Sequence, residues 1–76
     1  PFNPSTIIHY QLPFRSFVRL DVYDLLGREI TTLVNEEQNT GEYSVHFNSQ
    51  GLPSGIYFYR LAAGSQTITK KMVIVH

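Results

Sequence analysis

The side chains that could bind a metal or catalyse a reaction are few, and their spacing suits neither role. The histidines are His9, His46 and His76. His9 and His46 fall on the polar faces of alternating segments and His76 is the last residue, so no two of them have the spacing of a metal-ligand pair. The sequence contains no cysteine, which excludes thiolate metal sites and disulfides. We therefore predict that the chain holds no metal and no cofactor.

Serine, histidine and carboxylate side chains all occur, but no serine lies on the strained, Gly-flanked turn of a hydrolytic nucleophile. Glu36 and Glu37 are neighbours in a polar stretch, where they keep a turn solvated. Asp21 and Asp24 supply too few oxygens for a calcium loop. We predict no catalytic residue, and hence that the protein is not an enzyme.

The composition indicates one small folded domain that spans residues 1–76. Hydrophobic residues make up 42% of the chain, which is enough for a core. Six basic residues balance six acidic ones, and we interpret them as interspersed rather than clustered, so we expect no nucleic-acid partner. The longest apolar run, Met72 to Val75, is far shorter than the ~20 residues of a transmembrane helix. Because Pro1 is not an initiator methionine, we expect the chain to be a fragment of a longer protein.

Alternation of apolar and polar residues between clusters of Gly, Pro, Asn and Ser predicts six short strands. Their ranges are 6–12, 16–23, 28–34, 42–48, 56–63 and 66–75. The predicted connections are 13–15, 24–27, 35–41, 49–55 and a two-residue hairpin turn at 64–65. Short strands with closely spaced turns predict an all-β fold, a small immunoglobulin-like antiparallel β-sandwich of about six to seven strands.

The alternation also predicts which side chains face the core. The clearest inward positions are Ile8, Tyr10, Leu12, Val18, Leu20, Val22, Tyr43, Val45 and Phe47. Asp21 falls on a polar face that we expect to be solvated. Adjacent Leu33 and Val34 predict a bulge or a change of sheet. The segment 56–63 is apolar on both faces, so it should lie centrally in its sheet.

Two connections have a conformational requirement that their residues meet. Gly27 is the natural site for a positive φ after Asp24. The segment from Leu52 to Tyr57 places Gly55 two residues before Tyr57, which is the order of a tyrosine corner in immunoglobulin-like folds. We predict that the Tyr57 hydroxyl bonds to the backbone of the preceding corner while its ring fills the core.

Several residues on the predicted outer faces could serve binding. Four large apolar side chains lie opposite the inferred core: Phe17, Tyr23, Ile56 and Phe58. They form either a patch for a partner domain or, if the register is shifted by one, a buried layer. Lys70 and Lys71 lie in the last strand, where lysines discourage edge-to-edge pairing.

Four sequence strings occur in one order along the chain: Pro1-Phe2-Asn3-Pro4-Ser5-Thr6, Val22-Tyr23-Asp24-Leu25-Leu26-Gly27-Arg28-Glu29, Gly55-Ile56-Tyr57-Phe58-Tyr59-Arg60-Leu61 and Lys70-Lys71-Met72-Val73. Together they resemble the type A C-terminal sorting domain of the type IX (Por) secretion system of Bacteroidetes and related bacteria. The resemblance covers essentially the whole chain. The pattern is also similar to the immunoglobulin-like domain of flagellar hook-capping proteins, which usually has a longer insertion than residues 48–54 here.

The resemblance implies a non-catalytic sorting signal for a cargo domain upstream in the same chain. Such a domain crosses the periplasm, is recognised by the outer-membrane type IX translocon and is removed by a sortase-like protease, so that the cargo becomes extracellular or attached to the cell surface. The positions that match family motifs are Gly27, Gly55, Tyr57, Lys71 and Val73. The fold alone explains why the glycines and Tyr57 occur at their positions. The resemblance therefore points to the last strand, with Lys70, Lys71 and Val73, as the contact with the secretion machinery.

Two other functions remain open from the sequence. The domain could be a passive immunoglobulin-like module that spaces or docks a neighbouring domain, such as a carbohydrate-active one. It could also bind sugar directly through Tyr23, Phe58 or Tyr59, which would require an exposed aromatic platform.

Overall fold

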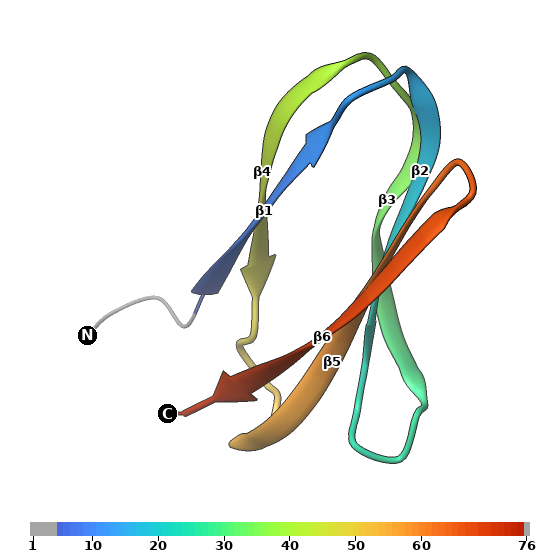
Figure 1. The fold of residues 1–76 in the computed structure, drawn as a ribbon. Helices are drawn as coiled ribbons and strands as arrows, with labels where there is room; N and C mark the ends of the chain where they lie inside the picture. Colours follow the sequence, from blue (N-terminus) through green and yellow to red (C-terminus); the bar gives the residue numbers. More distant parts are fainter. Residues whose placement is uncertain (1–4, 76) are drawn as a thin grey trace.

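The computed structural model describes residues 5–75, which form six strands in two facing antiparallel sheets (Figure 1). The strands are β1 (Ser5–Leu12), β2 (Ser16–Tyr23), β3 (Glu29–Gln38), β4 (Gly41–Asn48), β5 (Gly55–Ala63) and β6 (Gln66–Ile74). The predicted all-β, immunoglobulin-like sandwich is confirmed. His76 and most of the first family string lie outside the described residues.

The two sheets are unequal in size. β1 pairs with β4, and the larger sheet has the order β3-β2-β5-β6. The chain changes sheet between β1 and β2, between β3 and β4 and again between β4 and β5, so that connections join the two layers at both ends (Figure 1). No helix long and apolar enough to cross a membrane occurs in the described part of the chain.

The core lies between the two sheets and follows the predicted alternation. Val18, Leu20 and Val22 of β2 have no solvent-exposed surface. The opposite sheet contributes Ile8, Leu12 and Phe47, and the core is completed by Val34, Tyr57, Leu61, Met72 and Ile74. Within a strand the core residues are mostly two positions apart, as Val18, Leu20 and Val22 are. The reason is that successive side chains of a strand point to opposite faces.

The bulge predicted at Leu33 and Val34 is present. Leu20 pairs with Val34 and Asp21 pairs with Thr32, which leaves Leu33 as the extra residue. A second irregularity lies further along the same pair of strands, between Val22 and Tyr23 of β2. β3 is therefore an edge strand whose ladder is broken twice.

The prediction of a loop over 35–41 is wrong for residues 35–38, which continue β3. Asn35 pairs with Arg19 and Glu37 pairs with Phe17. An edge strand needs a partner on one side only, so its polar side chains can stay in water while its backbone is paired. A polar sequence therefore did not mean a turn at this position.

β5 lies between β2 and β6, as its apolar sequence predicted. The hairpin that joins β5 to β6 closes with Ala63 opposite Gln66. Gly64 has φ of +60° and no residue other than glycine has a positive φ in the described range, which fits a type II′ turn. β6 is thereby fixed as the second edge of the larger sheet.

Candidate functional site

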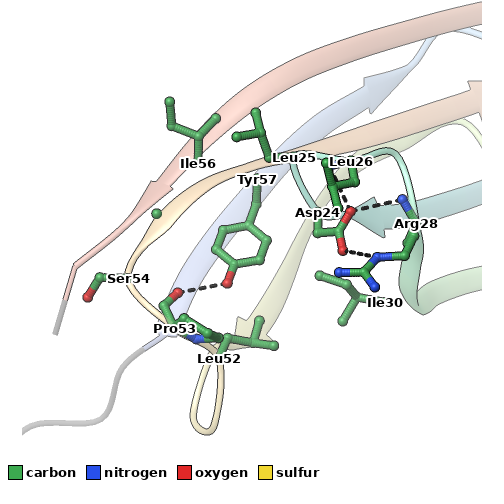
Figure 2. A pocket seen from close by; sticks show the side chains of 11 residues that line it. Asp24, Leu25, Leu26, Arg28, Ile30, Leu52, Pro53, Ser54, Ile56 and Tyr57 are labelled. Atoms are coloured by element: carbon green, nitrogen blue, oxygen red, sulfur yellow. Dashed lines mark hydrogen bonds and ion pairs between the residues drawn. The ribbon is translucent and has the colours of Figure 1, made fainter.

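The two central family strings meet at one end of the sandwich. The turn after β2 and the corner before β5 line an open groove of about 380 Å³ (Figure 2). Asp24 and Arg28 come from the turn, whereas Pro53, Gly55 and Tyr57 come from the corner. The fold therefore brings together segments that are far apart in the sequence.

The turn between β2 and β3 is held by the Asp24 carboxylate. Its Oδ1 accepts hydrogen bonds from the N–H groups of Leu26 and Arg28, both at 2.9 Å, and its Oδ2 accepts one from Arg28 Nε at 2.8 Å (Figure 2). The backbone adds bonds from Asp24 N–H to Arg28 O and from Gly27 N–H to Asp24 O. Gly27 has φ of +84°, which this turn requires.

This rigid turn presents two leucines to solvent. Leu25 is 63% exposed and Leu26 is 77% exposed. Neither leucine belongs to the core, so core packing of these side chains is not what holds the turn in place. A preorganised pair of exposed apolar side chains is a feature of protein-binding surfaces.

The hydrogen bonds to Asp24 predict a pH dependence for the turn. The backbone N–H of Arg28 is the main cause of a lowered pKa for Asp24, whose ordinary value is 3.8. A lowered folded pKa means that the stabilisation is complete above pH 3.8 and is lost as the pH falls through the lower, folded value. An NMR titration of the Leu26 and Arg28 amide protons should show a midpoint below 3.8.

The matched control for this titration is Asp24→Asn, in which the low-pH transition of the two amide protons should disappear. Glu42 is exposed and distant in sequence, so Glu42→Gln should leave the transition unchanged. A midpoint at or above the ordinary pKa of an aspartate would contradict the assigned role of the carboxylate.

The other side of the groove is the tyrosine corner. The Tyr57 hydroxyl donates a hydrogen bond of 2.7 Å to the Pro53 carbonyl while the ring is buried in the core (Figure 2). This is the contact that the sequence predicted. It fixes the path of the chain into β5 and therefore one wall of the groove.

Replacing Tyr57 with phenylalanine should lower the free energy of unfolding by about 1 kcal/mol, because the hydrogen bond from the Tyr57 hydroxyl to the Pro53 carbonyl is lost. For a domain of this size the melting temperature should fall by about 4–8 °C. The control is Tyr59→Phe, since the Tyr59 hydroxyl has no hydrogen-bond partner recorded among residues 5–75, and its melting temperature should change little. Equal shifts in the two variants would show that the Tyr57–Pro53 bond does not stabilise the fold.

The predicted outer apolar patch is divided by the structure. Tyr23 and Phe58 are cross-strand neighbours and half-buried, and Ile56 lies beside Val73. Phe17 is at the opposite end of β2, where it pairs with Glu37. Four of the exposed apolar side chains at this end are Leu25, Leu26, Ile56 and Val73, which we call the end surface.

The last-strand residues singled out from the sequence do not share one face. Lys71 is opposite Phe58 and Val73 is opposite Ile56, so both lie on the outer face of the larger sheet. Lys70 is opposite Tyr59, whose ring packs against the core, so it lies on the inner face. All three are exposed in the edge strand β6.

Sequence reasoning missed a buried carboxylate on the outer face of the larger sheet. Asp21 was expected in solvent, but it is 2% exposed. Arg19 Nε donates to both of its oxygens, at 3.1 and 2.9 Å, and Thr32 Oγ1 donates to Oδ1 at 2.7 Å. Tyr23 and the cross-strand Arg60 complete the cover over it.

The physical reason is that four large or polar side chains surround one position. Arg19 and Tyr23 flank Asp21 at two-residue spacing on the same strand face, and Thr32 and Arg60 lie opposite it on the neighbouring strands. The carboxylate raises the pKa of Arg19, first by hydrogen bonding and then by its charge. The Arg-x-Asp-x-Tyr spacing was the available sequence signal for the buried carboxylate. It could be interpreted only once the strand pairings were known.

Arg60 is held against Tyr23 rather than against a carboxylate. Its guanidinium lies 5.1 Å from the centre of the Tyr23 ring, and Nη2 donates to the Tyr23 hydroxyl at 2.6 Å. A cation over an aromatic face is attracted by the ring but keeps its full charge. The outer face of β5 therefore retains a positive charge.

The remaining candidates are not assembled into a site. His9 and His46 are exposed, and His9 Nδ1 is 2.9 Å from Ser44 Oγ. Within residues 5–75 no three His, Asp or Glu side chains are grouped as metal ligands. The aromatic residues considered for sugar binding are also divided, because Tyr59 packs against the core whereas Tyr23 and Phe58 lie on the outer face.

Comparison with known proteins gives a single assignment for the chain. The model of the secretion system C-terminal sorting domain matches residues 1–75. No curated protein and no solved structure was found to match. The match covers nearly the entire chain and includes the turn, the corner and the last strand. The chain therefore belongs to the family of secretion system C-terminal sorting domains of type IX secretion.

Proposed function

We propose that this domain is a non-catalytic tag that directs a cargo domain, upstream in the same chain, through the type IX secretion system. The observation that carries the proposal is the family match over residues 1–75. It is supported by the architecture, because the core side chains fill the space between the sheets and the conspicuous features lie on the surface.

In this proposal the folded domain crosses the periplasm and is recognised as a shape by the outer-membrane translocon. A sortase-like protease then removes it, and the cargo is released or attached to the cell surface. The domain takes part in these steps by binding alone. A fixed surface suits this role, since a contact that is already ordered loses little conformational entropy on binding.

Two parts of the surface are proposed to contact the machinery. One is the end surface, where the Asp24 turn holds Leu25 and Leu26 in solvent. The other is the last strand, with Lys70, Lys71 and Val73. Val73 connects the two, because it lies beside Ile56 of the end surface.

The test is a reporter protein that carries an inner-membrane export signal and this domain at its C-terminus, expressed in a bacterium with a type IX system. The reporter should be found outside the outer membrane. The matched control places the domain ahead of the reporter, where a C-terminal signal should not act. A C-terminal fusion that folds but stays in the periplasm would contradict the proposal and favour a passive spacer or docking module.

A further inference from the structure

The electrically neutral chain has a strongly uneven distribution of charge. All six acidic residues lie between Asp21 and Glu42. The sequence after Glu42 contains Arg60, Lys70 and Lys71 and no acidic residue. The sequence interpretation treated the charges as interspersed and missed this asymmetry. One half of the chain therefore carries an excess of negative charge and the other half an excess of positive charge.

The ion pairs of the described residues all lie within the first half of the chain. Arg15, Arg19 and Arg28 each form ion pairs with carboxylates. No ion pair of Arg60, Lys70 or Lys71 with a carboxylate occurs among residues 5–75. The cations of the second half all belong to β5 and β6, so the β6 edge of the larger sheet is positively charged and is not neutralised by the domain itself.

β6 is also the more accessible edge for another strand. It pairs with β5 in an unbroken register from Gly55–Ile74 to Ala63–Gln66, and residues 66–71 are all exposed. The other edge, β3, is interrupted by irregularities, which protect an edge from pairing. The larger sheet therefore has an irregular edge, β3, which disfavours pairing, and a regular edge, β6, which allows it.

The hairpin geometry identifies the backbone groups that are free on β6. A two-residue hairpin closes on a hydrogen-bonded pair, here Ala63 and Gln66, and bonded and non-bonded pairs then alternate. The pairs that contain Thr69 and Lys71 are of the non-bonded kind. The N–H and C=O groups of these residues consequently point away from β5, toward the free edge.

The two lysines limit what can occupy this edge. Lys70 and Lys71 are adjacent, so their side chains point to opposite faces of the sheet. A flat anionic surface such as a membrane can meet only one of these faces at a time. A strand added to the edge has side chains on both faces and can meet both lysines with two adjacent acidic residues.

We propose that β6 is a strand-addition site for an extended acidic segment of the secretion machinery. This inference rests on the proposed sorting function and names the contact by which the last strand is recognised. Backbone bonds to Thr69 and Lys71 supply the pairing, and the lysine charges select the partner. Two copies of β6 paired antiparallel about this position would bring lysines together, so the same residues disfavour self-association.

The experiment uses the C-terminal reporter fusion with four variants of the domain. Thr69→Pro removes a free N–H without removing a bond to β5, since proline is tolerated where an edge N–H faces solvent. It should lose export while the purified domain keeps its melting temperature. Thr69→Val keeps the N–H, and its fusion should be exported normally. Lys70→Gln with Lys71→Gln should lose export, and the corresponding double arginine variant should keep it.

The outcomes separate this inference from the proposed function. If the unmodified fusion stays in the periplasm, the sorting function fails. If the unmodified and Thr69→Pro fusions are exported equally, sorting stands and strand addition is wrong. A purified domain that dimerises in sedimentation, or that binds phosphatidylglycerol vesicles, and loses this property in Thr69→Pro would also overturn the inference by assigning the edge to a second copy or a membrane.

If Thr69→Pro proves unfolded, the charge variants decide the question, because Lys70 and Lys71 are exposed and their replacement leaves the core intact. Export of the double glutamine variant at the level of the double arginine variant would then exclude charge selection by this edge.

Discussion

Replacing Leu20 with alanine is expected to remove about 2–5 kcal/mol of the free energy of unfolding. Leu20 has 0% of its surface exposed and lies at the centre of β2, so truncation leaves a cavity that neighbours on both sheets must share. A domain of this size has a total stability of about 4–11 kcal/mol. Urea denaturation should therefore show a midpoint that is greatly lowered with little change in slope.

The matched control is Phe17→Ala on the same strand. Phe17 is a larger side chain but is 56% exposed on the outer face, so its truncation should change stability far less than that of Leu20. The comparison tests the register of β2, because a shift of one residue exchanges the two faces. A larger loss for Phe17→Ala than for Leu20→Ala would show that the faces are reversed.

The second large effect is expected at Asp21. Replacing it with asparagine keeps the size of the side chain but removes the charge that Arg19 and Thr32 bond to. Because the carboxylate is 2% exposed, water cannot replace these bonds, and we expect a loss of about 1–3 kcal/mol in the free energy of unfolding. Urea denaturation at neutral pH measures this loss.

Glu29 provides the control for Asp21. It is the second carboxylate near Arg19, at 3.5 Å from Nη2, and its side chain is half-exposed. An exposed ion pair contributes about 0–1 kcal/mol, so Glu29→Gln should change stability little. If the two variants lose the same amount, Asp21 is not the residue that organises the outer face.

The fold was predictable because strands such as β1, β2 and β4 each have one apolar face that packs in the core. In β1, β2 and β4 the alternation identified the inward residues, and Tyr57 was identified from its spacing to Gly55. These features depend on neighbours in the sequence and on a period of two. The same kind of local information fixed the positive φ at Gly27 and the hairpin at Gly64.

The features that were missed depend on strand pairing. Asp21 becomes buried only because Thr32 and Arg60 are placed opposite it by two different strands. The polar residues 35–38 belong to a strand because β2 offers them a paired edge. Neither relation can be obtained from local alternation, which says which face a residue takes but not which strand lies beside it.

The candidate site was predictable in part for the same reason. The last strand and its lysines were identified by resemblance, and their placement on opposite faces follows from their adjacency. The end surface required the structure, because the turn with Leu25 and Leu26 and the corner with Tyr57 meet only after the sheet has formed. The β6 edge was ambiguous, since lysines on an edge both discourage self-pairing and favour an acidic partner.

The central claim is that the secretion system recognises this domain only when it is folded. One measurement tests this claim most directly. The fraction of a C-terminally fused reporter outside the outer membrane is compared between Leu20→Asp, which places a charge in the core and unfolds the domain, and Phe17→Asp, which places it on the surface. The account predicts export with Phe17→Asp and retention with Leu20→Asp. Equal export of both fusions would contradict it.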